Sequence, residues 1–537
     1  MKKQTVFFLL FCLLTAFVWG QKTLIYLDHS DRLEFDKERW PDCQIVNGHV
    51  QFRHEDMIMF CDSAYFYDRT NYIVASGNIK MIQADTLFIY GDVLYYDGDT
   101  KLARLRHNVR MENKDATLYT DSLNYDRAQE VGYYFNGGRI IDKKDTLTSI
   151  NGNYYPKKEL AIFQYDVVLT NPDFVLTSDT LHYASKTKIA TILGPSNIVY
   201  EDSTHIYSEL GWYDTENNLA ELTLNSHVND LSGHRITADT LFHNHNTHLS
   251  EGFQNVQLND STQKIIITGG YGWYNDSLQS AMITQTPTLI QYDDKQESDS
   301  LFVAADSMWY LDTDSLQYIK AYYNVQAWKV DFQSICDSAY YNGMDSTLRL
   351  YGSPIMWNDS NQFTASEAIV YMANNEVERI ELEADAFIFS KVDSTAINQV
   401  SGNNIVGYLK ESKLYKADVS GNALSVYFIE EEPDSTQVDA PKEPSYVGIN
   451  KAESSELFLY FTEDNKIKRL VMTPQSNGVL HSPKKAKDTK ITRLAGYQDH
   501  QSLRPTSKTD IYIPKKREAL TAEEPAAKAR KKRRNRD

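Results

Sequence analysis

Three histidines that lie close together form the most metal-like group in this chain. They are His243, His245 and His248. Side chains two residues apart on a β-strand point to the same face, so His243 and His245 could bind zinc or copper together. The asparagines between the histidines favour a second interpretation, a polar hairpin tip, because asparagine is a common turn residue. The hairpin tip is the preferred interpretation, and the three histidines stay weak candidates for a metal site.

Aspartate recurs within a phrase that consists of a small residue, Asp, Ser or Thr, an apolar residue and then aromatic residues. Copies of the phrase occupy residues 61–67, 84–90, 120–125, 178–183, 238–242, 305–310 and 336–341. An aspartate at a fixed position of a repeat is expected to have a structural role, as an acceptor of backbone N–H bonds at a turn. A calcium ladder is the alternative, but the Gly-rich nonapeptide of calcium-binding β-helices is absent from the sequence.

Other catalytic signatures are also missing from the sequence. It contains no nucleophile elbow, no phosphate-binding glycine loop and no His-Glu-x-x-His motif. We therefore expect a protein that is not an enzyme and that needs no cofactor. The acidic body, with a net charge of −30 over residues 21–481 (36 basic against 66 acidic side chains), argues against nucleic acid as a partner.

The repeat determines the predicted fold. Asp62 and Asp337 are 275 residues apart, and weaker copies of the phrase divide this distance into nine intervals with a mean of roughly 30 residues. Each copy is followed by a second segment that closes on Gly or Asn and a β-branched residue, as in 76–79 and 106–109. Alternating apolar residues and abundant Tyr, Phe, Thr, Val and Ile indicate strands with one buried face. We predict an all-β, solenoid-like stack of strand-turn-strand-turn units.

The ends of the chain differ from the repeats. Residues 1–20 have the charged start and apolar centre of a cleaved signal peptide, which predicts export. Residues 431–450 are acidic and contain proline, which indicates a loop or linker, and residues 451–481 contain a terminal strand pair. Residues 482–537 carry 17 basic and 7 acidic side chains and are predicted to be a disordered tail that could contact an anionic membrane surface.

Three cysteines remain after the signal segment: Cys43, Cys61 and Cys336. An odd number cannot form a complete disulfide framework. Cys61 and Cys336 occupy the small-residue position of the phrase, so buried thiols are the preferred interpretation. A disulfide between Cys43 and Cys61 stays open as an alternative in an oxidising compartment.

The paired phrases resemble the OstA-like family, the LptA-type periplasmic proteins of lipopolysaccharide transport. The stretch 76–87, which joins Ser-Gly-Asn-Ile to Ala-Asp-Thr-Leu, resembles the family most, and the likeness extends over roughly residues 24–430. The resemblance implies a β-jelly roll over residues 21–430, or two consecutive jelly rolls. It implies an open slot between two sheets that holds the acyl chains of lipopolysaccharide.

What the resemblance implies for function is a non-catalytic bridge in the periplasm that carries lipopolysaccharide toward the outer membrane. Its other partners would be lipopolysaccharide-transport proteins that pair with its edge strands. Alternate apolar residues near the repeat starts are the candidate lipid-lining positions: Leu87, Ile89, Leu181, Tyr183, Leu241 and Met308. The alternative is a structural or adhesive cell-surface β-solenoid with a filled core and no lipid ligand.

Overall fold

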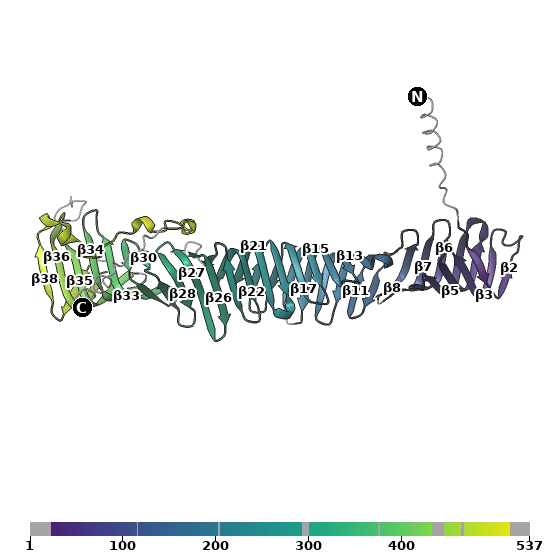
Figure 1. The fold of residues 1–537 in the computed structure, drawn as a ribbon, viewed down its shortest axis with the longest axis horizontal. Helices are drawn as coiled ribbons and strands as arrows, with labels where there is room; N and C mark the ends of the chain where they lie inside the picture. The colour runs from purple at the N-terminus through teal and green to yellow at the C-terminus, as the bar shows by residue number, and fades with distance from the viewer. Residues whose placement is uncertain are drawn as a thin grey trace, which may run out of the picture. The chain divides into compact units, whose positions relative to one another are not determined.

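The computed structural model describes residues 23–114, 116–201, 204–292, 300–373, 376–411, 413–431, 445–462 and 467–515. Almost all regular structure in these residues is β-strand, which confirms the all-β prediction (Figure 1). The chain divides into two compact units. The N-terminal unit contains residues up to Ser232 together with Thr237–Ser250, and the C-terminal unit contains Gly233–Ile236 and the residues from Glu251 onward.

The N-terminal unit is built from short and long strands in chain order. They are β1 Tyr26–His29, β2 Arg32–Glu34, β3 Gln44–His54, β4 Met57–Tyr67, β5 Tyr72–Gln83, β6 Leu87–Asp97, β7 Leu102–Asn113, β8 Ala116–Asp126, β9 Val131–Tyr134, β10 Gly138–Asp142, β11 Asp145–Ser149, β12 Asn151–Tyr155, β13 Leu160–Thr170, β14 Phe174–Ala184, β15 Ile189–Tyr200, β16 His205–Asp214, β17 Leu219–Leu224, β18 His227–Asn229 and β20 Thr240–Asn244.

The C-terminal unit continues the same pattern. Its strands are β19 His234–Thr237, β21 Leu249–Asp260, β22 Ile265–Asn275, β23 Ser280–Thr284, β24 Thr288–Gln291, β25 Leu301–Ala304, β26 Ser307–Thr313, β27 Leu316–Trp328, β28 Gln333–Asn342, β29 Thr347–Tyr351, β30 Ile355–Asn358, β31 Asn361–Thr364, β32 Glu367–Ala373, β33 Glu376–Lys391, β34 Ile397–Lys410, β35 Lys413–Glu430, β36 Tyr446–Phe461, β37 Ile467–Thr473 and β38 Asn477–His481.

Helical structure in the described residues is limited to single turns. The 3-10 turns are η1 Asp68–Thr70, η2 Pro156–Lys158, η3 His245–Thr247, η5 Pro483–Lys485, η6 Gln501–Leu503 and η7 Asp510–Tyr512, and one short α-helix, α2, spans Thr489–Thr492. Within the described part of the chain, no helix has the length and apolar character needed to cross a bilayer.

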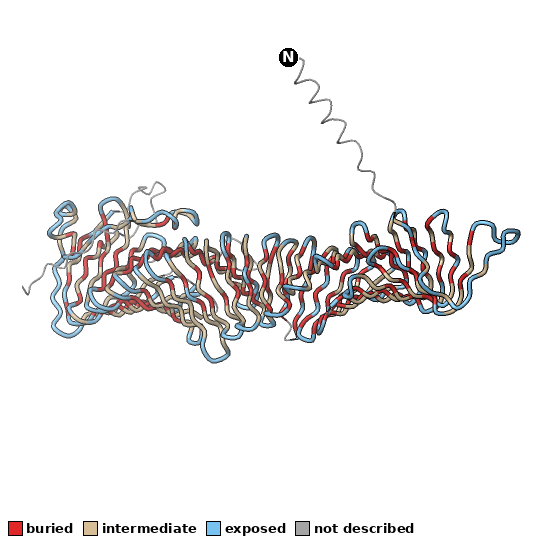
Figure 2. The backbone as a smooth tube through the Cα atoms, turned by 45° about the vertical axis from the view of Figure 1, so that its right-hand side comes forward, coloured by how far each residue is buried: buried red, intermediate tan, exposed pale blue. Residues whose placement is uncertain are grey.

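Consecutive strands pair antiparallel, so each unit is largely a meander. Along β4 and β6 the buried residues alternate in the same way, with Met57 and Met59 of β4 matching Leu87 and Ile89 of β6. Figure 2 shows this alternation along the strands and the exposed turns that join them. Side chains of alternate residues point to opposite faces, so one face of the meander forms the core, as the sequence pattern predicted.

A β-bulge bends most long strands near their middle. In β5, Gly77 and Asn78 have φ values of 77° and 43°, and the register with β4 shifts between Phe60 and Ser63. The Asn78 side-chain amide donates a hydrogen bond to Asp62 Oδ2 at 2.8 Å. Asn108 and Asp92 repeat this contact at 2.7 Å. Bulges increase strand bending, so each of these pairs marks a corner where the sheet folds.

The corners correct one part of the predicted unit. The Gly-Asn segments lie inside strands, at the bulges, and do not separate one strand from the next. The aspartate has the predicted structural role, although its donor is a side-chain amide and not a backbone N–H. The local reason is that two consecutive residues in the left-handed region turn the strand without ending its pairing, which resumes on both sides of the bulge.

The copy of the phrase at Asp85 was placed in the wrong register. Asp85 lies in the turn between β5 and β6, with φ 53°, whereas Asp92 occupies the corner position of Asp62. The steps from Asp62 to Asp92 and from Asp92 to Asp121 are then 30 and 29 residues, in place of 23 and 36. The repeat is therefore more regular in three dimensions than in the sequence phrase.

The prediction of a disordered tail is wrong for residues 482–515, which pack against the C-terminal unit. We call residues 489–513 the strap. Leu494 lies in a core cluster with Phe387, Phe389 and Phe428, and Leu503 packs against Ile335, Ile355 and Trp357. The strap covers a sheet face that would otherwise be apolar and exposed, because four consecutive residues of β28, from Gln333 to Cys336, are all buried. Residues 516–537 lie outside the described residues.

Glutamine side chains hold the backbone of the strap. Gln399 donates to the Thr492 carbonyl oxygen at 2.7 Å and accepts from the Leu494 N–H at 3.0 Å. Gln362 likewise donates to the Gln498 carbonyl oxygen at 2.9 Å and accepts from the His500 N–H at 2.9 Å. A buried amide must find partners, and the strap provides them for both glutamines.

Other predictions about the ends of the chain have different outcomes. Cys43 and Cys61 are buried thiols that are not bonded to each other, and burial raises the pKa of Cys61 to about 12.

The acidic segment connects two neighbouring strands, because β35 and β36 pair directly at Glu430 and Tyr446. Its residues 432–444 lie outside the described residues. The predicted signal peptide, residues 1–20, also lies outside them.

Candidate functional site

The six candidate lipid-lining residues all point into the core. Their exposed fractions range from 0% to 5%, and the six are Leu87, Ile89, Leu181, Tyr183, Leu241 and Met308. The inward direction agrees with the predicted register. A side chain with almost no accessible surface has no water-sized space beside it, so the interior is close-packed at these positions. Whether they contact lipid stays a prediction.

A row of buried tyrosines closes this interior in the N-terminal unit. These closing tyrosines follow one another at intervals of 29, 29, 29 and 30 residues, and they are Tyr96, Tyr125, Tyr154, Tyr183 and Tyr213. Each is the next-to-last residue of its strand. Their hydroxyl groups must be hydrogen-bonded because an unpaired buried hydroxyl costs roughly 1–3 kcal/mol.

The partners of the closing tyrosines come from the opposite row of turns. Tyr125 donates to Gln83 Oε1 at 2.8 Å, and the Asn113 side chain donates to the Tyr154 oxygen at 3.0 Å. A straight strand of 11 residues would span roughly 36 Å. Opposite ends of the hairpins can meet only because the strands fold at their corners. We call the line where the two rows of turns meet the seam.

The seam contains charged side chains at Tyr96, the first of the closing tyrosines. The Tyr96 oxygen lies 2.6 Å from His54 Nδ1 and accepts from the Arg127 guanidinium at 2.7 Å. Arg127 also forms an ion pair with Asp56 at 2.7 Å. Burial raises the pKa of Tyr96 to about 12, so the phenol stays protonated at neutral pH. Burial, followed by the nearby Arg127 charge, lowers the pKa of His54.

Tyr183 differs from the other candidate lining residues. Its hydroxyl group lies 2.9 Å from Asp145 Oδ2 and 3.2 Å from Asp142 Oδ2, and Lys188 forms an ion pair with Asp142 at 2.5 Å. The ring of Tyr183 faces the core, but its polar end belongs to the seam. Its role in the structure is therefore to join the two rows of turns.

A polar cavity of about 190 Å³ opens beside the seam in the N-terminal unit. Four lysines and two acidic residues are among its lining residues: Lys114, Lys143, Lys186, Lys188, Asp142 and Glu159. Four positive and two negative side chains give the cavity an excess of two positive charges. Because the body of the chain is acidic, this is a local site where an anionic group of small size could be held.

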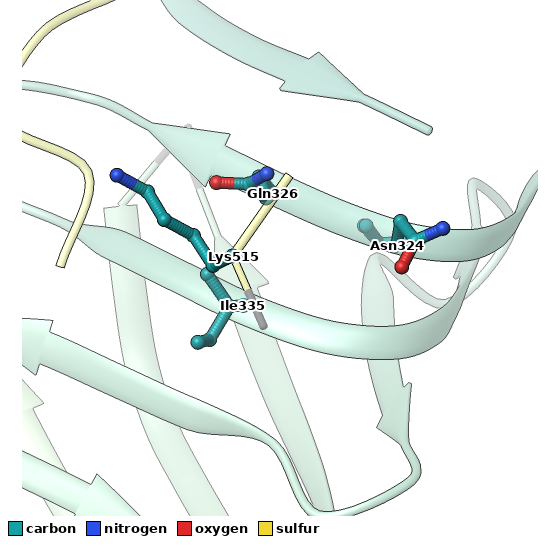
Figure 3. Close-up of a pocket in the computed structure, with 5 residues that line it drawn as sticks. Asn324, Gln326, Ile335 and Lys515 are labelled. Atoms are coloured by element: carbon teal, nitrogen blue, oxygen red, sulfur yellow. The ribbon is translucent and has the colours of Figure 1, made fainter. Parts of the chain in front are cut away.

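A second, much smaller space lies in the C-terminal unit, under the end of the strap segment. Its volume is about 10 Å³, and Asn324, Gln326, Ile335 and Lys515 are among the residues that line it (Figure 3). Gln326 donates to the Ile513 carbonyl oxygen at 2.8 Å. This space is no larger than one water molecule needs, so it marks the seating of the strap and does not form a ligand site.

The rings of the three candidate metal-binding histidines lie near one another, with centroids 6.2 Å apart for His243 and His245 and 5.5 Å apart for His245 and His248, but the three do not have metal-ligand spacing. His243 is buried, with Nδ1 2.9 Å from the Ser250 hydroxyl oxygen, and the His245 ring stacks on Tyr200 at 3.6 Å. His248 follows η3, with the left-handed φ of 57°. The segment forms the predicted hairpin tip between β20 and β21. Among the described residues, the group with metal-ligand spacing is instead His234, Asp260 and Asp312.

The N-terminal part of the folded meander is similar to a known protein family. Residues 22–179 match the family model described as OstA-like protein. This part of the chain is similar to that family. The match covers β1 to the middle of β14, and therefore includes the corners at Asn78 and Asn108 and three of the closing tyrosines. A search of curated proteins found no match to this chain.

The OstA-like match confirms the resemblance inferred from the paired phrases. The match ends at residue 179. Strands beyond it have corners of the same kind, for example where the Asn324 side chain donates to Asp306 at 2.9 Å.

Two functional features escaped the sequence reasoning. The closing tyrosines have a clear signal, since a tyrosine recurs every 29 or 30 residues from Tyr96 to Tyr213, but their partners lie about 40 residues away. The strap also has a signal, in unbroken apolar runs such as residues 386–389 and 355–357. Such runs indicate strands that are buried on both faces, which requires a cover.

Proposed function

We propose that the protein is a non-catalytic lipid carrier of the periplasm that takes lipopolysaccharide toward the outer membrane. The observation that carries the proposal is the OstA-like match over residues 22–179 on a folded β-meander with a mainly apolar core. The lysine-rich cavity beside the seam supports it, because a phosphate or sugar-acid group would be held there outside the apolar interior.

Acyl chains would enter by parting the seam. The interior is close-packed at the candidate lining residues, so lipid must replace contacts between the two halves of the folded sheet. Burial of about ten methylene groups is worth roughly 8 kcal/mol, at ~0.8 kcal/mol each. The net contribution of one seam hydrogen bond is about 1 kcal/mol. Lipid transfer can therefore offset the loss of several closing contacts.

Site-specific photo-crosslinking tests the proposal. A photo-reactive residue at Leu87 or Leu181 should crosslink to lipopolysaccharide in the native envelope. The matched controls are the neighbours Phe88 and His182, which lie on the other face of the same strands. Equal labelling at both faces, or no lipopolysaccharide adduct at any position, would count against an internal path.

A structural or adhesive β-solenoid remains the second candidate function. The observation that favours it is the absence of free space beside the six inward residues, from Leu87 to Met308. Native mass spectrometry of the protein purified from its own envelope separates the two functions. A carrier should retain lipid in some molecules, whereas a filled solenoid should be detected only at the mass of the polypeptide.

A further inference from the structure

Three metal-ligating side chains meet at one point of the C-terminal unit. His234 lies in β19, Asp260 ends β21 and Asp312 lies in β26. One nitrogen or oxygen atom from each of them lies within 4.8 Å of the other two. The side chains of His234 and Asp260 are each 2% exposed and that of Asp312 is 15% exposed, so a small opening to solvent is present at Asp312.

A fourth oxygen atom lies among these three ligand atoms. The Tyr310 hydroxyl oxygen is 2.5 Å from Asp260 Oδ2, 3.3 Å from Asp312 Oδ2 and 3.1 Å from His234 Nε2. Asp260 is also fixed from behind, because its Oδ1 accepts the backbone N–H groups of Thr262 and Gln263 at 2.8 and 2.9 Å. The four donor atoms therefore converge on a common volume and are held by regular structure.

The N-terminal unit contains a similar group without metal-ligand chemistry. Tyr183 lies between Asp142 and Asp145, and the ammonium group of Lys188 supplies a permanent positive charge at 2.5 Å from Asp142. The group in the C-terminal unit differs in chemistry, because its basic member is His234 and not a lysine. Lysine cannot bind a metal ion in its protonated form, whereas neutral imidazole is a common metal ligand.

The distances between the side chains of the C-terminal group are those of metal ligands rather than of hydrogen-bonded partners. His234 Nε2 lies 3.8 Å from Asp260 Oδ2 and 4.0 Å from Asp312 Oδ2, which is too far for a hydrogen bond. Two ligands that are each about 2.1 Å from a zinc ion lie at most about 4.2 Å apart. Both histidine-to-carboxylate distances fit this limit, and the oxygen atoms of the third pair, Asp260 and Asp312, lie within 4.8 Å of each other.

We propose that His234, Asp260 and Asp312 form a divalent-metal site. Two carboxylates and one imidazole make a nitrogen-and-oxygen donor set that suits Zn²⁺ and other transition cations better than Mg²⁺. A divalent cation would neutralise both carboxylates. Its role in the fold would be to tie β19, β21 and β26 together. The site does not depend on the proposed lipid function.

The competing arrangement has no metal. In it the Tyr310 hydroxyl group alone joins His234, Asp260 and Asp312 through its short contacts. The experiment below distinguishes this arrangement from the metal site.

The test uses full-length protein freed of metal by dialysis against a chelator. Titration with Zn²⁺ in a calorimeter should give one tight site per chain, and Zn²⁺ should raise the melting temperature. His234→Ala and Asp312→Asn should each weaken Zn²⁺ binding at least tenfold. The first control is His245→Ala, at the hairpin tip, and the second is Asp145→Asn, at the lysine-containing group. Both should bind Zn²⁺ like the native protein.

Co²⁺ gives a readout that needs no variant. Four-coordinate Co²⁺ with nitrogen and oxygen ligands should produce strong visible absorption that Zn²⁺ removes. Native protein that binds no Zn²⁺ above the level of Asp312→Asn would overturn the proposal, and so would an equal loss in His245→Ala. If His234→Ala does not fold, Asp312→Asn and the Co²⁺ spectrum of the native chain still decide the result.

Discussion

The hydroxyl group of Tyr183 donates a hydrogen bond to Asp145 Oδ2 at 2.9 Å, although 38 residues separate the two side chains. Tyr183 lies next to the last residue of β14, and Asp145 is the first residue of β11. The contact joins two rows of turns that a flat meander would hold far apart. It therefore reports directly that the sheet is folded over its apolar face.

Tyr183→Phe should destabilise the N-terminal unit by about 1–3 kcal/mol, because Asp142 and Asp145 would lose a buried donor. Urea denaturation followed by circular dichroism measures the change. Tyr95→Phe is the matched control, since Tyr95 is an exposed tyrosine on the neighbouring face, and it should change stability by less than about 0.5 kcal/mol. Equal effects of the two substitutions would contradict the role of the seam.

Gly77→Ala should weaken the corner at Asp62. Gly77 has φ 77°, and an added Cβ would lie 2.4 Å from Asp62 Oδ2. The substitution combines a left-handed backbone with a steric clash, so a loss of about 1–3 kcal/mol is expected. Gly194→Ala is the control, because its Cβ would meet its nearest neighbour at 3.8 Å. A control that loses as much stability as Gly77→Ala would refute the explanation.

The N-terminal unit should lose stability in mild acid through His54. Its folded-state pKa is lowered by burial and then by Arg127, so the unfolded chain binds more protons at this residue. The contribution of His54 to the free energy of unfolding is therefore fully present above about pH 6.5, and it is lost as the pH falls below that value. Denaturation midpoints between pH 5 and 8 measure the effect, and His54→Gln should reduce their dependence on pH. An unchanged pH profile in that variant would assign the acid sensitivity to other groups.

Leu494→Asp should release the strap from the C-terminal unit. The substitution places a charge in the cluster with Phe387 and Phe428, where burial of an unpaired charge is strongly unfavourable. Trypsin should then cut at Arg493 and Arg504 faster, and the uncovered face should promote self-association in size-exclusion chromatography. Ala495→Asp is the control, because Ala495 is exposed. Identical cleavage rates would show that Leu494 does not anchor the strap.

The sequence by itself determined the local structure. Alternation in segments such as 57–61 and 87–91 gave the strands and their buried faces, and the Gly-Asn pairs gave the places where the chain bends, although these are corners within strands and not the predicted turns between them. These features depend on residues close together in the chain, since side-chain alternation and left-handed backbone preferences are local properties. The inward direction of Leu87 and Leu181 was predicted for the same reason.

Only the tertiary structure decided which distant residues meet. The partner of Tyr183 depends on how far the folded sheet advances with each hairpin, and the position of the strap depends on a face formed by several strands. The same holds for His234, Asp260 and Asp312, whose sequence separations of 26 and 52 residues gave no metal motif. Such contacts depend on the pairing registers of all the strands that lie between the residues, and a local sequence pattern does not specify those registers together.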